Sequence, residues 1–128
     1  MKRASPEDKL HIWTADYLRV AACCPWWHVP NQGKRTIQWV MKLKKMGVRA
    51  GVPDFCFILP PAGRAAFLEL KYGKRGQRVG QEAFQADAEA AGALYAIART
   101  SDEVIGILRG WGAVRGSAAV NDILRGAA

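Results

Sequence analysis

The stretch GVPDFCFILPPAGRAAFLELK, residues 51–71, decides the expected fold. It predicts two short strands, Phe55–Leu59 and Arg64–Leu70, because both segments are apolar and rich in β-prone residues. The residues between them, Pro60-Pro61-Ala62-Gly63, are typical of a turn. The two strands are therefore expected to form a hairpin.

Three charged residues interrupt this apolar stretch. Alternate side chains of a strand share a face, so Glu69 and Lys71 should point the same way, about 6.6 Å apart along the chain. The hairpin brings the chain back to Asp54, which places all three groups at one edge of a sheet. Charged groups beside apolar strands are costly unless they are paired or bind a ligand.

A divalent cation would relieve the repulsion between two neighbouring carboxylates. Hard oxygen ligands with an open coordination shell suit Mg²⁺ or Mn²⁺. Such an ion polarises a phosphoryl oxygen and lowers the pKa of a bound water, while Lys71 would orient the water or neutralise charge on phosphorus. The alternative is a buried Glu69–Lys71 pair with Asp54 capping a turn. The Pro53-Asp54 pair at hairpin distance favours the metal site.

Motifs along most of the chain, from Glu7 to about Trp111, resemble the virus-type replication-repair nuclease (VRR-NUC) domain of the PD-(D/E)xK nuclease superfamily, in its stand-alone phage or prophage form. The matching residues are His28-Val29-Pro30-Asn31, Gly33-Lys34-Arg35, Gly51-Val52-Pro53-Asp54, Phe67-Leu68-Glu69-Leu70-Lys71, Gly76 and Gln81. The resemblance implies a metal-dependent nuclease that acts on structured or branched DNA.

The resemblance also implies roles for individual residues. Asp54 and Glu69 would bind the metal with the backbone carbonyl of Leu70, and Gln81 would help to arrange the site. An acid on the first helix often completes such sites, and Glu7 is the candidate. For Gln81 the alternative is a helix-surface amide, and for Glu7 it is an acid favoured by the helix dipole. His28 could contact DNA or orient a site residue, although a structural histidine is the favoured interpretation.

The charge pattern points to a polyanionic partner. The chain has a net charge of +8, and no acid lies between Asp16 and Asp54. Clustered cations of this kind are the electrostatic footprint of DNA, the alternative being a merely soluble basic surface. The candidate DNA-binding residues are Lys34, Arg35, Lys42, Lys44, Lys45, Lys74, Arg75 and Arg78.

The length of the chain and its cysteines limit the expected number of domains and the expected cellular compartment. With 128 residues the chain is expected to form a single domain over residues 1–128, with an uncertain tail from about residue 112. Three cysteines without a disulfide pattern predict a reducing, cytoplasmic compartment. A metal cluster of Cys23, Cys24 and His28 is disfavoured, because free cysteines are ordinary core residues. The sequence predicts no secretory signal, no membrane span and no organic cofactor.

The remaining pattern predicts an α/β fold: a restriction-endonuclease-like mixed sheet flanked by helices. A first helix should begin at the N-cap Ser5, with Asp8 at the capping-box distance, and carry an inward face as far as Ala21. The other predicted elements are a strand at Trp26–Val29, helices at Thr36–Met46 and Gln77–Ala91, a strand at Ala93–Ile97, and a helix capped by Ser101-Asp102-Glu103 that ends near Trp111. A short helix over Val120–Leu124 is a further possibility.

Taken together, these features predict a homodimeric endonuclease that resolves four-way (Holliday) junctions. One small domain has one site and cuts one strand, so symmetric cutting requires two protomers. The alternatives are a flap or end-processing nuclease with the same chemistry, and a non-catalytic module that binds structured DNA. The side chains of Trp26, Trp27 and Trp39 could stack on unpaired bases, but packing in the core or a dimer interface is favoured.

Overall fold

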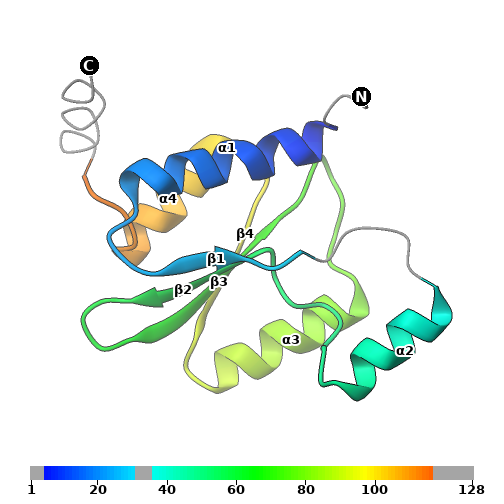
Figure 1. Ribbon diagram of the computed structural model, residues 1–128. Coiled ribbons are helices and arrows are strands. Elements are labelled where there is room, and N and C mark those ends of the chain that lie inside the picture. The colour runs from blue at the N-terminus through cyan, green and yellow to red at the C-terminus, as the bar shows by residue number, and fades with distance from the viewer. Residues whose placement is uncertain (1–4, 31–35, 117–128) are drawn as a thin grey trace.

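A computed structural model describes residues 5–30 and 36–116 (Figure 1). The elements follow one another as α1 (Pro6–Ala21), β1 (Trp26–His28), α2 (Ile37–Lys45), β2 (Phe55–Leu59), β3 (Arg64–Leu70), α3 (Val79–Ala90), β4 (Leu94–Ala98) and α4 (Ser101–Trp111). The predicted α/β class, with a mixed sheet flanked by helices, is confirmed.

The four strands form one sheet in the order β1-β2-β3-β4. The pairs β1–β2 and β2–β3 are antiparallel, and β4 runs parallel to β3. The predicted hairpin is present: Phe55 pairs with Leu68, and the amide of Gly63 closes the turn on the carbonyl of Leu59 at 2.9 Å. The Pro60–Pro61 peptide bond in this turn is cis. One step further along the same register, Asp54 comes opposite Glu69.

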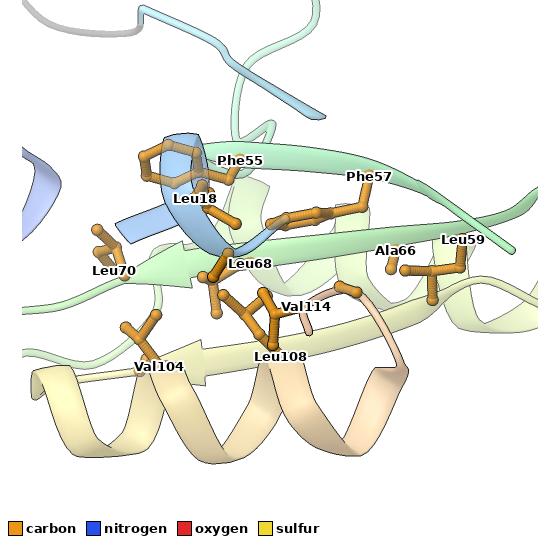
Figure 2. Packing of buried hydrophobic residues seen from close by; sticks show 13 residues of the cluster. Leu18, Phe55, Phe57, Leu59, Ala66, Leu68, Leu70, Val104, Leu108 and Val114 are labelled. Carbon is orange, nitrogen blue, oxygen red and sulfur yellow. The ribbon is translucent and has the colours of Figure 1, made fainter. Parts of the chain in front are cut away.

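The main core lies between the sheet and the helices α1 and α4, which cover the same face (Figure 1). Because side chains alternate along a strand, Phe55, Phe57 and Leu59 of β2 all point into this core, where they meet the Ala66, Leu68 and Leu70 set of β3 (Figure 2). The helices add Leu18, Val104 and Leu108, which are almost fully buried. Burial of this face fixes the hairpin register, since a slip by one residue would move each core side chain to the other face.

The opposite face of the sheet is covered by α3 (Figure 1). Phe67 of β3 meets Phe84 of α3 edge-on, with ring centroids 5.0 Å apart, and Tyr95 of β4 lies beside the same ring. Glu69 lies two residues after Phe67 and therefore faces the α3 side. The alternation that buries Leu68 and Leu70 in the main core thus turns the acid toward α3.

Helix α2 differs from the other three. It spans Ile37–Lys45 instead of the predicted Thr36–Met46, because Thr36 is its N-cap, with its hydroxyl accepting from the amide of Trp39. None of the nine residues of α2, all of them described, is buried. Ile37 is 76% exposed and Met41 is 56% exposed.

Element boundaries differ from the predictions by one or two residues. Val29 lies outside β1, α3 starts at Val79 instead of Gln77, and β4 is shifted by one residue to Leu94–Ala98. The cap of the last helix was misassigned. Thr100, not Ser101, is the N-cap of α4, because its hydroxyl accepts from the amide of Glu103 at 3.2 Å. The predicted segment Val120–Leu124 lies outside the described residues.

Candidate metal site and nucleic-acid surface

A cavity of about 640 Å³ opens where the N-terminus of α1, the end of β3 and the start of α3 meet. Ten residues line it: Ser5, Glu7, Asp8, Asp54, Glu69, Lys71, Arg75, Gly76, Arg78 and Gln81. The structure thus brings together all five of the predicted side chains that were assigned to catalysis or to the metal. They come from separate parts of the chain, which only the fold places side by side.

Asp54 is held from three directions although it precedes β2. Its backbone carbonyl accepts a hydrogen bond from the amide of Val29 at 2.9 Å and lies 2.7 Å from Nδ1 of His28. Its side-chain Oδ2 accepts from the amide of Leu70 at 2.7 Å. With the residue only 8% exposed, these contacts fix the carboxylate at the end of the hairpin, beside that of Glu69.

Glu69 is the residue of the cavity whose charged form is most disfavoured by its surroundings. It is 4% exposed, and its Oε2 has no hydrogen-bond partner among the described residues. Burial raises the pKa of Glu69 to about 9, and the neighbouring Asp54 carboxylate adds to the increase, whereas Lys71 opposes it. A buried carboxylate next to another carboxylate disfavours its charged form unless a positive group compensates.

Lys71 is buried at the same edge and is tied to α3. Its Nζ donates to Oε1 of Gln81 at 2.6 Å. The same amide oxygen accepts from the backbone of Arg78 at 2.9 Å, and the Gln81 side-chain nitrogen lies 3.5 Å from Oε1 of Glu69. Gln81 is therefore no free surface amide: it links the start of α3 to both charged residues at the end of β3.

The approach of α3 to the site depends on a glycine. Gly51 has a φ of +82°, and a Cβ at this position would overlap the backbone of Gly80. Only a glycine allows the loop before Asp54 to lie against the first turn of α3. The close contact puts Gln81 within reach of Lys71. The sequence resemblance included Gly51, but its packing partner could not be inferred from the sequence.

Glu7 reaches the cavity from α1, where Ser5 caps the helix in the predicted capping box with Asp8. Its carboxylate pairs with Arg75 at 3.5 Å. Arg75 is 70% exposed along its side chain, so the pair is easily opened and contributes little to stability. Glu7 is in the right place for the predicted role, although its one described ion pair is with an arginine.

The residues present fit a two-carboxylate cation site. Within residues 5–30 and 36–116, no group of three or more His, Cys, Asp or Glu side chains is arranged to hold a metal. Mg²⁺ usually binds one or two carboxylates and keeps several waters, so Asp54 and Glu69 suffice. The partnerless Oε2 of Glu69 is an oxygen of the kind that such an ion would bind.

The basic residues fall into two groups. Arg75 and Arg78 line the cavity and Lys74 is exposed between β3 and α3, beside it. Lys42, Lys44 and Lys45 occupy the last turn of α2 and are exposed or half-buried at the surface. Lys34 and Arg35 lie outside the described residues.

Two other sequence interpretations can now be judged. Cys23 and Cys24 direct their thiols to the carbonyls of Gly112 and Ala113, whereas His28 contacts the main-chain carbonyl of Asp54. This contact is one that a structural histidine makes and one that would also orient a candidate site residue, so both interpretations of His28 stay open. Sequence reasoning missed His11, whose Nε2 lies 3.8 Å from Oδ2 of Asp54. The signal was available: His11 follows Glu7 by four residues and shares its helix face.

One solved structure, described as a "VRR_NUC domain protein", superposes on the chain with a TM-score of 0.67 and covers 90% of this chain and 100% of its own. The chain has the VRR-NUC fold. The two sequences are only 17% identical, so the likeness lies in the arrangement of elements. No family model matches the sequence, and neither does any curated protein.

The VRR-NUC fold agrees with the resemblance inferred from the motifs. In the part of the chain that the structure describes, no helix is long and apolar enough to cross a membrane.

Proposed function

We propose that this protein is a divalent-metal-dependent DNA endonuclease that hydrolyses phosphodiesters at the Asp54–Glu69–Lys71–Gln81 site. One observation supports the proposal above all: two buried carboxylates and a buried lysine share one cavity edge, and the pKa of Glu69 is raised to about 9. Lys71 can compensate one of the two acids, and the high pKa of Glu69 means that the second stays protonated unless another positive group compensates it. A bound cation would supply that charge.

Asp54 and Glu69 are the proposed metal ligands. The amide of Leu70 points toward Asp54, and the amide and carbonyl of one strand residue point to the same side. The Leu70 carbonyl therefore faces the same edge, as a third ligand requires. Glu7 lies across the cavity and can be released from Arg75 to join them. When bound, Mg²⁺ or Mn²⁺ supplies an activated water and stabilises charge on phosphorus.

Lys71 has the task of neutralising charge on the phosphoryl group or orienting the attacking water. Its bond to Gln81 at 2.6 Å aims the ammonium across the cavity edge. Gln81 also lies near Glu69, so it keeps the lysine and the acid at a fixed separation. This is the positioning role that we assign to Gln81.

DNA is the proposed partner. Arg75 and Arg78 on the cavity wall, with Lys74 beside them, can contact phosphates next to the cut site. Lys42, Lys44 and Lys45 at the exposed end of α2 are further candidates for phosphate contacts. Lys34 and Arg35 are also proposed from the sequence but lie outside the described residues. The three cysteines are free, which is consistent with a reducing, cytoplasmic setting.

We further propose that two protomers act together on four-way junctions. The exposed apolar residues of α2 support this: Ile37, Trp39, Val40 and Met41 are all about half exposed or more, without packing partners in the core. Contiguous apolar surface of this kind marks an interaction site. A two-fold dimer through α2 would cover it and supply the second cut.

Light scattering at micromolar concentration tests the dimer. The double substitution Val40→Ser with Met41→Ser should shift the protein to the monomer. Ile12→Ser is the matched control, because Ile12 is 55% exposed on α1 and lies away from α2. A wild-type protein that is strictly monomeric would contradict the dimer and leave the nuclease assignment standing.

A panel of labelled substrates tests the activity itself. Duplex, flap and four-way-junction DNAs are incubated with Mg²⁺, with Mn²⁺ or with a chelator, using the wild-type protein and Glu69→Gln. We expect metal-dependent cleavage by the wild type only, with the junction cut best. Cleavage of flaps or free ends in preference would favour the end-processing alternative, and tight binding without cleavage would favour a non-catalytic module.

A further inference from the structure

Next to Asp54 lies a histidine that the proposed chemistry does not use. His11 of α1 has its side chain 11% exposed, and its Nε2 is buried without a hydrogen-bond partner among the described residues. That nitrogen lies 3.8 Å from Oδ2 of Asp54. His11 does not line the cavity, so it cannot touch DNA bound there.

Packing alone does not explain a histidine at this position. Its ring lies 5.3 Å from that of His28, edge-on, and 6.0 Å from that of Phe55. A phenylalanine would make these contacts without a buried polar atom. Leaving a buried nitrogen unpaired costs free energy, and an unpaired group of this kind calls for a cause.

The environment of Asp54 gives that cause. Nδ1 of His28 lies 2.7 Å from the Asp54 carbonyl. Since a carbonyl only accepts, this nitrogen must bear a proton, and His28 fixes the main chain of Asp54. Oδ2 accepts one hydrogen bond, from the Leu70 amide. A carboxylate oxygen has room for a second, and the atom that faces it is Nε2 of His11.

We propose that His11 is a positioning residue, which donates a hydrogen bond from Nε2–H to Oδ2 of Asp54 and so directs Oδ1 toward the bound cation. The present separation of 3.8 Å is longer than a hydrogen bond. Contacts around catalytic groups often tighten only when the ligand is bound. The inference rests on the proposed function, because it assigns His11 to the metal ligand Asp54.

Two substitutions separate donation from packing. His11→Phe keeps the ring and removes the donor, whereas His11→Gln keeps a donor and removes the ring. Calorimetric titration with Mn²⁺ alone should show affinity weakened about tenfold or more in His11→Phe, the effect typical of outer-shell partners of a metal ligand. His11→Gln should stay within about threefold of the wild type. Wild-type affinity in His11→Phe, or an equal loss in both variants, would overturn the proposal.

A second measurement needs neither a metal nor a variant. Long-range ¹H–¹⁵N spectra of the wild-type protein report which ring nitrogen of each histidine bears a proton. We expect a proton on Nε2 of His11 and on Nδ1 of His28. A bare Nε2 on His11 would overturn the donation to Asp54.

The two measurements also distinguish a failure of this inference from a failure of the proposed function. If the wild type binds no Mn²⁺ and Asp54→Asn behaves identically, the metal-nuclease assignment fails. The proton position on His11 then still decides whether this side chain holds the Asp54 carboxylate.

Discussion

The cavity edge and helix α2 both combine charged and apolar residues, yet the two regions differ in which of these residues are buried. At the edge, Asp54, Glu69 and Lys71 are each at most 8% exposed and are tied to neighbours. In α2 no residue is buried, and apolar Ile37 is 76% exposed. One region buries its charges, and the other exposes its apolar side chains.

Both arrangements have a cost that stability alone does not explain. Burying charges costs free energy unless they are well paired, and the pKa of about 9 at Glu69 shows that its negative charge is not compensated at this edge. Exposing apolar residues forfeits about 25 cal/mol for each Å² that stays in water. The comparison teaches that both regions have features that the packing of this chain does not explain. The proposed cation would explain those of the edge, and the proposed second protomer those of α2.

Substitution of the two carboxylates is expected to have the largest effect. Asp54→Asn and Glu69→Gln should each lower the cleavage rate roughly a thousandfold or more, since a bound metal supplies several kcal/mol to the transition state. The folded structure should survive, because Gln is close in shape to the protonated Glu69 that burial favours. Cleavage assays and thermal melts check both parts. A fully active Glu69→Gln protein would sink the site assignment.

Lys71→Ala should come next, with cleavage reduced about 10²–10³-fold, as when one group that stabilises transition-state charge is removed. Mn²⁺ affinity should change far less than in the carboxylate variants, because Lys71 binds Gln81 instead of the metal. Lys74→Ala is the control, since Lys74 is exposed close by. Equal losses in both lysine variants would reduce Lys71 to a general source of positive charge.

Gly51→Ala tests how the edge is assembled. The new Cβ would overlap the Gly80 backbone, pushing α3 and Gln81 away from Lys71. We expect a loss of about 1–3 kcal/mol of stability beyond the backbone strain itself. Gly47→Ala is the matched control, because Gly47 also has a positive φ, +98°, but open space at its Cβ position. Chemical denaturation of both variants measures the difference. Equal losses would show that the approach of Gly51 to Gly80 is unimportant.

The raised pKa of Glu69 predicts how metal-free stability depends on pH. In the unfolded chain this group titrates near 4.3, whereas in the folded protein its pKa is about 9. Between those values the unfolded chain binds fewer protons, so stability falls as pH rises. The melting temperature should drop by a few degrees more in the wild type than in Glu69→Gln between pH 5 and 9, with no metal present. Parallel pH profiles would contradict the assigned environment.

The sequence was sufficient for the edge but not for α2, and the reason is physical. The hairpin and the placement of Asp54, Glu69 and Lys71 follow from strand alternation and turn chemistry, which are local rules. Amphipathicity likewise predicts that α2 is a helix. It does not say whether the apolar stripe meets the core of the same chain or another surface, because docking depends on residues far apart in sequence.

The same distinction explains what was missed at the site. His11 approaches Asp54 across 43 positions of sequence, and Gly51 meets Gly80 across 29, as their residue numbers show. No local pattern marks either pair. The roles of Gln81 and Glu7 were inferred from a resemblance, and only the folded arrangement explains why an amide at the start of α3 can reach a lysine at the end of β3.

The smallest expected effect belongs to the lysines of α2. If Lys42, Lys44 and Lys45 bind phosphates, replacing all three with Gln should lower the slope of log affinity against log salt by at most about 3, roughly one for each lysine that no longer neutralises a phosphate. The control replaces Lys9, Arg19 and Arg109, which are exposed on α1 and α4, and so changes the net charge equally. Fluorescence anisotropy with a labelled four-way junction between 50 and 200 mM salt, roughly the range over which phosphate binding weakens most visibly, gives both slopes.

A slope that falls only for the α2 variant would place this helix on DNA as well as at the proposed dimer interface. Equal changes in both variants would mean that α2 contributes overall charge alone, and its exposed apolar face would then serve protein association without DNA.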